Sequence, residues 1–289
     1  MELTHISKAG GRLSSVLRDE MGMSMSLMNK LKWSESLLVN GVPCHTDHPV
    51  QPGDTVTARL PDKEPEYPAQ DGPLTILYED DHFLAVDKPA GMLIHPSRSC
   101  FTGTLANYVL GYYKKTGQSC AFHPITRLDR DTFGVVLLAK NPHIHSLIME
   151  QLRNGEVQKT YFALVYGKPP LEGMIDAPIA RKEPPSLLRY VDESGKKSVT
   201  TYRCIESWES YSLLELHPIT GRTHQLRVHC AYIGHPILGD PQYGDAASLA
   251  LSAQMGVETQ ALCAGTLEFV HPITGEQMRI ATKMAVYKK

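Results

Sequence analysis

The chain lacks the features that mark exported, membrane-spanning or metal-stabilised proteins. No apolar run approaches the roughly 20 residues that a membrane-spanning helix needs, and the N-terminal stretch MELTHISKAGGRL has no apolar signal core. The 6 cysteines are scattered without a CxxC pair, which favours reduced thiols over a disulfide framework or a zinc site. We therefore expect a cytoplasmic protein that is not inserted in a membrane.

Composition sets the size and the class of the protein. A chain of 289 residues is long enough for one large domain and a small one, and its 42% hydrophobic and 21% charged residues are typical of a soluble globular protein. The net charge is −2, but residues 61–88 contain eight Asp or Glu and two Lys, a local charge of −6. The rest of the chain therefore carries +4 (−2 minus −6), which is compatible with a basic groove for nucleic acid.

A proline-rich acidic stretch divides the chain. Residues 61–73 (PDKEPEYPAQDGP) show no apolar periodicity, so we expect a linker there, between a small module at 1–60 and a body at 74–289. Strand-like segments at 37–39 and 54–60 predict a small sheet in the module. Two helices are predicted before this sheet, because apolar residues recur there at helical spacing: Leu13, Val16 and Leu17, then Leu27, Met28 and Leu31.

The body begins with strand-like segments and a helix. TILYED and HFLAVDK flank a turn at Asp80–Asp81 and predict a hairpin. The apolar run Val135–Ala139 predicts a buried strand. A helix is predicted after it, because Asn141 is a good N-cap, Pro142 suits the first helical position and Gly155 follows the last residue of an apolar stripe.

Strands dominate the rest of the body. KTYFALVYG (159–167) alternates as a strand does, with Tyr161 on one face. SLLEL (212–216) predicts another strand, followed by a helix that begins with Thr223 as its cap and stops at Gly234. Because helices intervene irregularly between these strands, the predicted fold class is α+β.

The tetrapeptide HPIT occurs three times, at 123–126, 217–220 and 271–274. The copies are 94 and 54 residues apart, so there is no fixed repeat period. Each copy offers a single histidine, with no second ligand at metal-binding spacing. We interpret HPIT as a proline-fixed turn at the edge of a strand, and we expect the chemistry in the residues that follow each copy.

The first HPIT is followed by RLDRDTFG, which places one carboxylate between two cations. Asp129 lies between Arg127 and Arg130, and Gly134 allows a close backbone approach. A carboxylate flanked by cations stays ionised at neutral pH and can act as a nucleophile. From this octapeptide alone, a surface turn with salt bridges is an equal alternative. A phosphatase loop is excluded, because Thr132 comes one place too early and the sequence before Asp129 is poor strand material.

The second HPIT is followed by GRTHQLRVH, with Arg222 at the turn and Arg227 one turn inside the predicted helix. Arg227 borders the apolar face, and a buried arginine is rarely tolerated without a carboxylate partner. A solvated amphipathic helix is the alternative, and it is the better supported one for this stretch alone. Tyr161 is ordinarily a core aromatic, and it gains a function only if it shares a cleft with Asp129 and an arginine.

Taken together, these stretches resemble the RluA-type pseudouridine synthases. The resemblance covers roughly residues 74–289, and several long motifs in order are more specific than any one of them. The module at 1–60 resembles an S4 RNA-binding domain, through RLSSVLRDE, LLVNG and PGDTV. The matching motifs of the body are KPAGMLIHP (88–96), RLDRDTFGVVLLAK (127–140), KTYFALVYG (159–167), GKKSVT (195–200), HPITGRTHQLRVHCAYIGHPILGD (217–240), YG (243–244) and LEFVHPITGE (267–276).

The resemblance implies an RNA pseudouridine synthase, an isomerase that converts specific uridines of rRNA or tRNA to pseudouridine. It implies a catalytic domain with a mainly antiparallel mixed β-sheet flanked by helices. Asp129 would be the nucleophile, Tyr161 would pack against the target base and Arg227 would pair with Asp129. No cofactor or metal is implied, because the reaction includes neither a redox step nor phosphoryl transfer. We expect a monomer, because no feature of the sequence requires a second subunit.

The resemblance also implies residues that contact RNA. Arg127 would help to displace the target base from its helix, and Leu267 would line the base pocket. Phosphate or other RNA contacts would come from three further cations: Arg130, Arg222 and Lys196.

Two residues depart from the family pattern. Thr126 stands where the family usually has His, and Phe133 replaces the usual Ser. Together with the S4-like module, these departures motivate an alternative hypothesis, a catalytically silent RNA-binding or ribosome-assembly protein, although the three catalytic residues are present. A hydrolytic glycosidase is a weaker alternative, because it needs a second carboxylate and no paired-carboxylate motif is evident.

Overall fold

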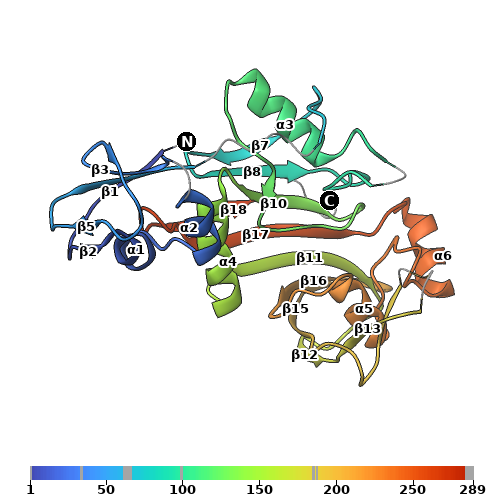
Figure 1. Ribbon diagram of the computed structural model, residues 1–289. Helices are drawn as coiled ribbons and strands as arrows, with labels where there is room; N and C mark the ends of the chain where they lie inside the picture. Colours follow the sequence, from blue (N-terminus) through green and yellow to red (C-terminus); the bar gives the residue numbers. More distant parts are fainter. Residues whose placement is uncertain are drawn as a thin grey trace.

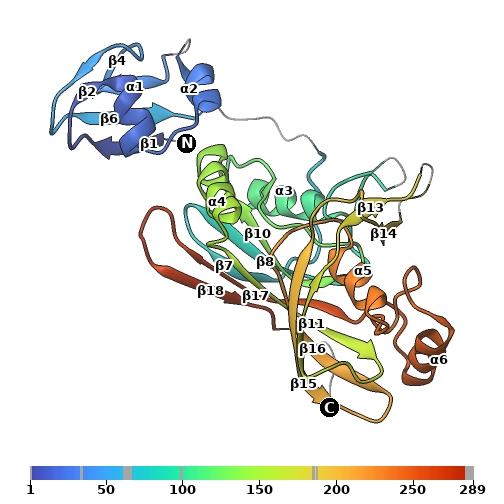
Figure 2. The ribbon, with the colours of Figure 1, turned by 90° about the horizontal axis from the view of Figure 1, so that it is seen from below.

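The computed structural model describes residues 2–32, 35–60, 67–97, 100–183, 186 and 188–283. The N-terminal residues build a four-stranded sheet and the rest of the chain builds a ten-stranded sheet (Figure 1). Figure 2 shows the N-terminal elements to one side of the larger sheet. None of the helices in the described part of the chain has the length and apolarity that crossing a membrane requires.

The N-terminal residues form a small unit of strands and short helices. The four-stranded sheet has the order β1-β6-β3-β4 and comprises β1 (Glu2–Ile6), β3 (Leu37–Val39), β4 (Val42–Pro43) and β6 (Thr55–Arg59). A second ladder joins β2 (Gly11–Arg12) to β5 (Pro49–Val50). The helical segments are α1 (Leu13–Ser15), the π-helical η1 (Val16–Glu20) and α2 (Met25–Leu31).

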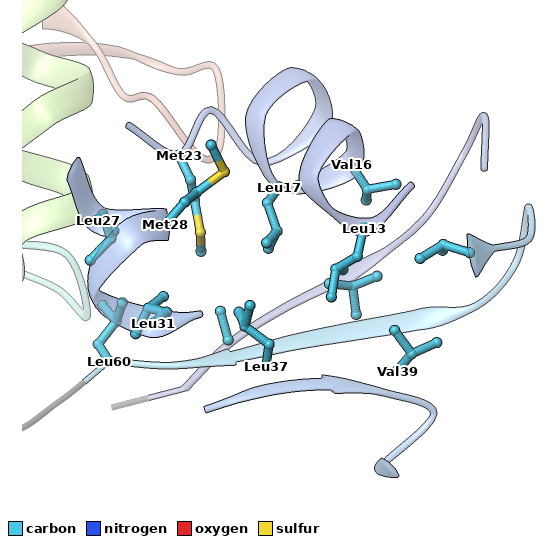
Figure 3. Close-up of a cluster of buried hydrophobic side chains, with 13 residues drawn as sticks. Leu13, Val16, Leu17, Met23, Leu27, Met28, Leu31, Leu37, Val39 and Leu60 are labelled. Carbon is cyan, nitrogen blue, oxygen red and sulfur yellow. The ribbon is translucent and has the colours of Figure 1, made fainter. Parts of the chain in front are cut away.

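The apolar positions of these helical segments point into one core, which Figure 3 shows. Leu13 and Leu17 are fully buried and face Leu31 and Leu37 in the same cluster. The predicted helices and strands of the module are therefore present. Strand β1 was not predicted, because its residues alternate weakly and its place is decided by pairing with β6, far along the chain.

The second half of the predicted linker is held on the body. The N–H of Gln70 donates to the carbonyl of Asn107 at 3.0 Å, and Asn107 Nδ2 donates to the carbonyl of Pro68 at 2.8 Å. Asn107 belongs to helix α3 (Leu105–Lys115), and a Cβ on Gly111 of that helix would meet the Gln70 carbonyl at 2.1 Å. Residues 67–73 thus cover part of α3, whereas residues 61–66 of the predicted linker lie outside the described residues.

The larger sheet is mostly antiparallel and has the order β12-β15-β16-β11-β17-β10-β8-β7, with β18 beside β17 and β9 beside β10. Among the described strands, only β10 and β17 pair in parallel. The strands are β7 (Ile76–Glu79), β8 (Phe83–Lys88), β9 (His123–Pro124), β10 (Phe133–Ala139), β11 (Gln158–Tyr166), β12 (Glu172–Asp176), β15 (Val199–Ser207), β16 (Tyr211–Pro218), β17 (Leu262–Val270) and β18 (Gln277–Ala281).

A separate hairpin and three more helices complete the body. The hairpin is β13 (Ile179–Arg181) with β14 (Arg189–Val191), and the helices are α4 (Pro142–Asn154), α5 (Gln225–Tyr232) and α6 (Ala246–Met255). The predicted α+β class, with a mainly antiparallel mixed sheet flanked by helices, is confirmed.

Two helices cover opposite faces of the sheet. Val135 and Leu137 of β10 pack in one cluster with Ile144 of α4. Val136 packs in a different cluster with Leu105 of α3. Because successive residues of a strand point to opposite faces, α3 and α4 lie on opposite sides of β10. The distinction matters for the site, which lies on the α3 side.

Several local predictions hold in detail. Asn141 caps α4 by accepting from the N–H of Ile144 at 2.9 Å, Pro142 occupies the first position, and Gly155 ends the helix with φ +77°. Strands β7 and β8 form the predicted hairpin, and β10 is buried from its second residue onward. On β11, Ala163 packs in one cluster and its neighbour Leu164 in another, as the alternation predicts.

Helix α5 begins differently from the prediction. Its N-cap is His224, with a left-handed φ of +59° and no side-chain cap bond. The prediction of Thr223 as the cap is wrong, because Gln225 closes the turn instead, with Oε1 accepting from the Arg222 N–H at 3.0 Å. Gly234, with φ +79°, follows the last turn as predicted.

The HPIT copies lie at strand edges. The first supplies β9, which pairs with β10, and the second contains the end of β16 at Pro218. The third follows β17, and its His271 carbonyl accepts from the N–H of Gly275 at 2.8 Å. These placements agree with the interpretation of HPIT as a turn at the edge of a strand.

Candidate active site

The loop before β10 carries Asp129 and is tied down at two points. Lys88, at the end of β8, is fully buried, and its Nζ donates to three backbone carbonyls at 2.8–2.9 Å, among them that of Arg130. Gln260 Nε2 donates to Thr132 Oγ1 at 2.5 Å. Burial lowers the pKa of Lys88 to about 8, and the nearby carboxylates, including Asp129, oppose that shift. The carboxylate of Asp129 thus stands on a fixed segment.

Three adjacent strands bring Tyr161 to this loop. Gly134 of β10 lies opposite Ala264 of β17, and Ala264 lies opposite Tyr161 of β11, where the pairing has a bulge. Gly134 has φ +109°, and an added Cβ would meet the Ala264 carbonyl at 2.2 Å. Only glycine permits this close approach of β10 to β17, and the close approach that the sequence predicts at Gly134 is present.

Asp129 and Arg227 form an ion pair, with 3.3 Å between Arg227 Nη1 and Asp129 Oδ2. The Asp129 side chain is 29% exposed, whereas that of Arg227 is 6% exposed. The carboxylate is therefore accessible from solvent, and the guanidinium that binds it lies on its buried side. The pairing that the resemblance implies is therefore present.

The main partner of Arg227 is Asp240. Arg227 Nε donates to Asp240 Oδ2 and Nη2 to Oδ1, both at 2.7 Å, and Nη2 also donates to Gln242 Oε1 at 2.8 Å. Asp240 is fully buried. Although burial opposes it, the hydrogen bonds and charge of Asp240 raise the pKa of Arg227 above its usual value. The guanidinium that contacts Asp129 therefore stays protonated at physiological pH.

Tyr161 lies beside the same carboxylate. It packs in one cluster with Leu128 and in another with Leu226, the chain neighbours of Asp129 and Arg227. Burial raises the pKa of Tyr161 to about 12, and the negative charge of Asp129 adds to the rise. The phenol is therefore neutral at physiological pH, and the ring is one wall of the site.

Two residues that had no predicted role complete the surroundings of Asp129. His224 Nε2 lies 3.8 Å from Asp129 Oδ2, and His224 Nδ1 lies 2.8 Å from the hydroxyl of Tyr243. The Tyr243 ring stacks on the guanidinium of Arg227, 4.9 Å from ring centroid to Cζ. Burial raises the pKa of Tyr243, so its hydroxyl stays protonated.

The four predicted RNA-contacting cations are all exposed. Arg130 pairs with Asp131 at 3.1 Å, whereas Arg127 makes no ion pair within the described part of the chain. Arg222 Nε donates to the carbonyl of Lys197, next to Lys196, at 3.1 Å. Arg222 and Lys196 thus lie near each other, and Arg127 and Arg130 flank Asp129 along the loop.

Leu267 lies away from these residues. It is 3% exposed and packs with Phe83 and Ile144 in the cluster on the α4 side of the sheet. Tyr161 packs with Ala264 in the cluster on the α3 side. The structure therefore does not bring Leu267 to Asp129, and Ala264 is the β17 residue that lies beside Tyr161.

The arrangement suits nucleophilic chemistry by one carboxylate, that of Asp129. Asp240 is unavailable as a second acid or base, because it is fully buried and both of its oxygens bind Arg227. Among the described residues, no group of three or more His, Cys, Asp or Glu could hold a metal ion. The exposed cations around the carboxylate suit a polyanionic ligand.

The missed residues carried a signal in the sequence. Lys88, Asp240 and Gln260 are polar residues within or beside apolar stretches (AVDKPAG, PILGD and TQALCAG). A buried polar group needs a partner, so such positions predict hydrogen-bonding or ionic roles. The partners Arg130 of Lys88 and Thr132 of Gln260 are not readable from the sequence, because they lie 42 and 128 residues away.

Known proteins match this chain over most of its length. The family described as RNA pseudouridylate synthase matches residues 82–232. "Uncharacterized RNA pseudouridine synthase YjbO" of Bacillus subtilis is 36% identical over 264 residues, covering 90% of this chain and 91% of that protein. "Ribosomal large subunit pseudouridine synthase D" of Xanthomonas campestris is 38% identical over 283 residues, covering 94% of this chain and 85% of that protein.

Solved structures agree with the sequence matches. The human protein "RNA Pseudouridylate Synthase Domain Containing 1" superposes with a TM-score of 0.61 at 26% identity, over 75% of this chain and 86% of that one. The human "RNA Pseudouridylate Synthase Domain Containing 4" gives 0.59 at 28% identity, over 73% and 88%. The chain therefore belongs to the RNA pseudouridylate synthase family and is an isomerase.

Proposed function

We propose that the protein converts specific uridines of ribosomal RNA to pseudouridine, with Asp129 as the nucleophile. The observation that carries the proposal is the partly exposed Asp129 carboxylate held by the buried Arg227 beside the ring of Tyr161. The ribosomal substrate is favoured by the relative from Xanthomonas campestris, whose name assigns it to the large ribosomal subunit. Transfer RNA is the other substrate class that the test below includes.

The chemistry explains why a carboxylate is needed. The N1–C1′ bond of uridine breaks, the base turns, and a C5–C1′ bond forms; the hydrogen on C5 leaves and N1 gains one. The detached base would be lost without a covalent or tightly held intermediate, and a carboxylate nucleophile provides one. Arg227, itself held by Asp240, would orient the Asp129 carboxylate for this step.

A uridine within a helix must leave the base stack to reach Asp129, at a cost of a few kcal/mol. Arg127 would fill the space that the base leaves, and its exposure two residues before Asp129 supports this role. Tyr161 then stacks on the everted ring, a contact worth about 1–3 kcal/mol. Binding energy from these two contacts offsets the cost of eversion.

Phosphate contacts are assigned to the exposed cations around the site. Arg222 and Lys196 lie near each other on one side, and Arg130 follows Asp129 on the loop. Phosphates bound by these residues would place one nucleotide at the carboxylate without reading its sequence.

The N-terminal unit is assigned as an S4-like RNA-binding module at 1–60, and the catalytic domain at 74–289. Support comes from the motifs RLSSVLRDE, LLVNG and PGDTV, and from the separate core of this unit. A second RNA-binding surface would raise affinity for a large RNA through the linked-site effect.

Release of tritium from RNA labelled at C5 of uridine tests the function. Wild-type protein is expected to release tritium from ribosomal RNA, and Asp129→Asn to release none above background. Asp131→Asn, two residues away on the same loop, is the matched control and is expected to retain activity. Equal release by wild type and Asp129→Asn would falsify the assignment of the nucleophile. RNA binding by wild type with no release from ribosomal or transfer RNA would favour the catalytically silent RNA-binding protein instead.

A further inference from the structure

His224 and Arg227 face the same oxygen of Asp129. Arg227 Nη1 lies 3.3 Å and His224 Nε2 lies 3.8 Å from Oδ2. Within the described part of the chain, Oδ1 of Asp129 has no hydrogen-bond partner. The two oxygens of this carboxylate are therefore in different surroundings: Oδ2 faces the guanidinium of Arg227 and a ring nitrogen of His224, and Oδ1 faces neither.

The hydroxyl of Tyr243 contacts the Nδ1 nitrogen of His224. The Tyr243 hydroxyl oxygen accepts from the backbone N–H of Arg189 at 2.9 Å and lies 2.8 Å from His224 Nδ1. The proposal below requires that the phenol donates its proton to Nδ1 across this contact. The neutral imidazole then carries its own proton on Nε2, the nitrogen that faces Asp129.

The imidazole is held in its neutral form. Burial lowers the pKa of His224, the cations Arg227 and Arg189 lower it further, and Asp129 and Asp240 oppose them. A neutral Nε2–H can orient a carboxylate by a hydrogen bond without adding a second full positive charge beside it. A second charge would stabilise the carboxylate and reduce its nucleophilicity.

The backbone of His224 is strained in the way that functional positions often are. Among the described residues other than glycine, only Asn40 and His224 have positive φ, and that of His224 is +59°. Such a conformation is uncommon for residues that have a side chain and clusters at active sites. At the start of α5, the strain places the imidazole between Tyr243 and Asp129.

We propose that His224 is a positioning residue for the reaction: with Arg227 it provides two donors for Oδ2 of Asp129 and leaves Oδ1 as the oxygen that attacks the substrate. This inference rests on the proposed role of Asp129 as nucleophile. The distance of 3.8 Å is longer than a hydrogen bond. Hydrogen bonds of this kind are often long without substrate and tighten when substrate binds.

Two substitutions distinguish the contributions of Nδ1 and Nε2 of the imidazole. In His224→Asn the amide replaces the Nδ1 side, keeps the contact with Tyr243 and suits the left-handed backbone, but it cannot reach Asp129. In His224→Gln the longer amide can replace the Nε2 donor. We expect kcat for tritium release to fall about 10- to 100-fold in His224→Asn, with KM unchanged, and to recover most of the loss in His224→Gln.

His224→Gly is a further variant that separates function from folding. Glycine adopts a φ of +59° without strain, which offsets part of the loss of the imidazole contacts, so the melting temperature is expected to stay close to that of wild type while kcat falls as in His224→Asn. Equal kcat in wild type and His224→Asn, or equal losses in His224→Asn and His224→Gln, would overturn the proposal. With Asp129→Asn inactive in the same assay, such a result rejects the role of His224 alone and leaves the proposed function standing.

The tautomer is measurable without RNA. Protein labelled with ¹⁵N in its 13 histidines gives long-range ¹H–¹⁵N spectra, in which His224 is assigned by its loss in His224→Asn. We expect a protonated Nε2 and a bare Nδ1 between about pH 6 and 8, and a mixture of tautomers in Tyr243→Phe, which keeps the ring but loses the hydroxyl. A protonated Nδ1 in wild type would overturn the proposal.

Discussion

Arg227 and Asp240 form a buried bidentate ion pair, with Nε–Oδ2 and Nη2–Oδ1 distances of 2.7 Å. Asp240 is fully buried and Arg227 is 5% exposed. This pair leaves only Nη1 of the guanidinium for Asp129. The ion pair with Asp240 thus fixes the orientation of the guanidinium and, with it, the position of Nη1 relative to Asp129.

Asp240→Asn should damage both stability and activity. The substitution leaves the Arg227 charge buried without its main partner, which typically costs about 3–5 kcal/mol. We expect the free energy of unfolding, measured by urea denaturation, to fall by that amount and kcat for tritium release to fall as well. Glu268→Gln is the control, because it removes an exposed ion pair with Arg279 and should change stability by less than about 1 kcal/mol.

Lys88→Met should loosen the loop that carries Asp129. Lys88 is fully buried and holds three backbone carbonyls, including that of Arg130. An unsatisfied buried polar group costs about 1–3 kcal/mol, so we expect lower stability and a kcat at least about 10-fold lower, the rate equivalent of 1.4 kcal/mol. Lys114→Met, at an exposed position in the last turn of α3, should behave as wild type. Unchanged kcat in Lys88→Met would show that the loop does not depend on this anchor.

Tyr161 should contribute to RNA binding through its ring. The phenol, with a pKa of about 12, is neutral at physiological pH, so it offers a stacking surface and no charge. In an Asp129→Asn background, Tyr161→Leu should weaken binding of substrate RNA by about 1–3 kcal/mol, whereas Tyr161→Phe should bind like the parent. Fluorescence titration with a labelled RNA fragment measures the affinity of each variant. A similar loss of affinity in the two variants would argue for the hydroxyl and against stacking.

Acid should destabilise the protein through His143. Burial, with a smaller effect of His82, lowers the pKa of His143 to about 4. The unfolded chain binds a proton there near pH 6.5 and the folded chain does not, so stability falls as pH falls from about 6.5 to 4, by up to about 3 kcal/mol. When thermal denaturation is measured across this pH range, the melting temperature of His143→Leu should fall less than that of wild type. His45→Leu, at an exposed site, should retain the slope of wild type.

RNA affinity should depend on salt through the exposed cations. Binding to phosphates releases counterions, so the logarithm of the binding constant falls linearly with the logarithm of salt concentration. Arg222→Gln and Lys196→Gln should each reduce that slope by about 0.7–0.9. Arg279→Gln, which removes an exposed cation already paired with Glu268, should leave the slope unchanged. A slope that is the same in all three variants would place the RNA elsewhere on the molecule.

The local elements of this fold follow from neighbouring residues. Asn141, Pro142 and Gly155 bound α4 because capping and helix termination act within one turn. The alternation of β11 and the hairpin of β7 and β8 are likewise set by side chains close together in the chain. The prediction fails where contacts with a distant strand hold a side chain: Gln225 Nε2 donates to the carbonyl of Val199 at 3.0 Å, and its Oε1 accepts from the Arg222 N–H, so Thr223 is not the cap of α5.

The sequence by itself identified the candidate residues of the site: Asp129, Tyr161 and Arg227 stand in motifs that resemble those of the family. Tertiary structure alone decided how they are held. Asp240 binds Arg227, Lys88 anchors the loop, and Leu267 is buried on the other face of the sheet. The physical reason is that helix caps and strand alternation depend on short-range geometry. Ion pairs, buried carbonyl contacts and sheet order join residues far apart in the chain, and packing of the whole domain selects them.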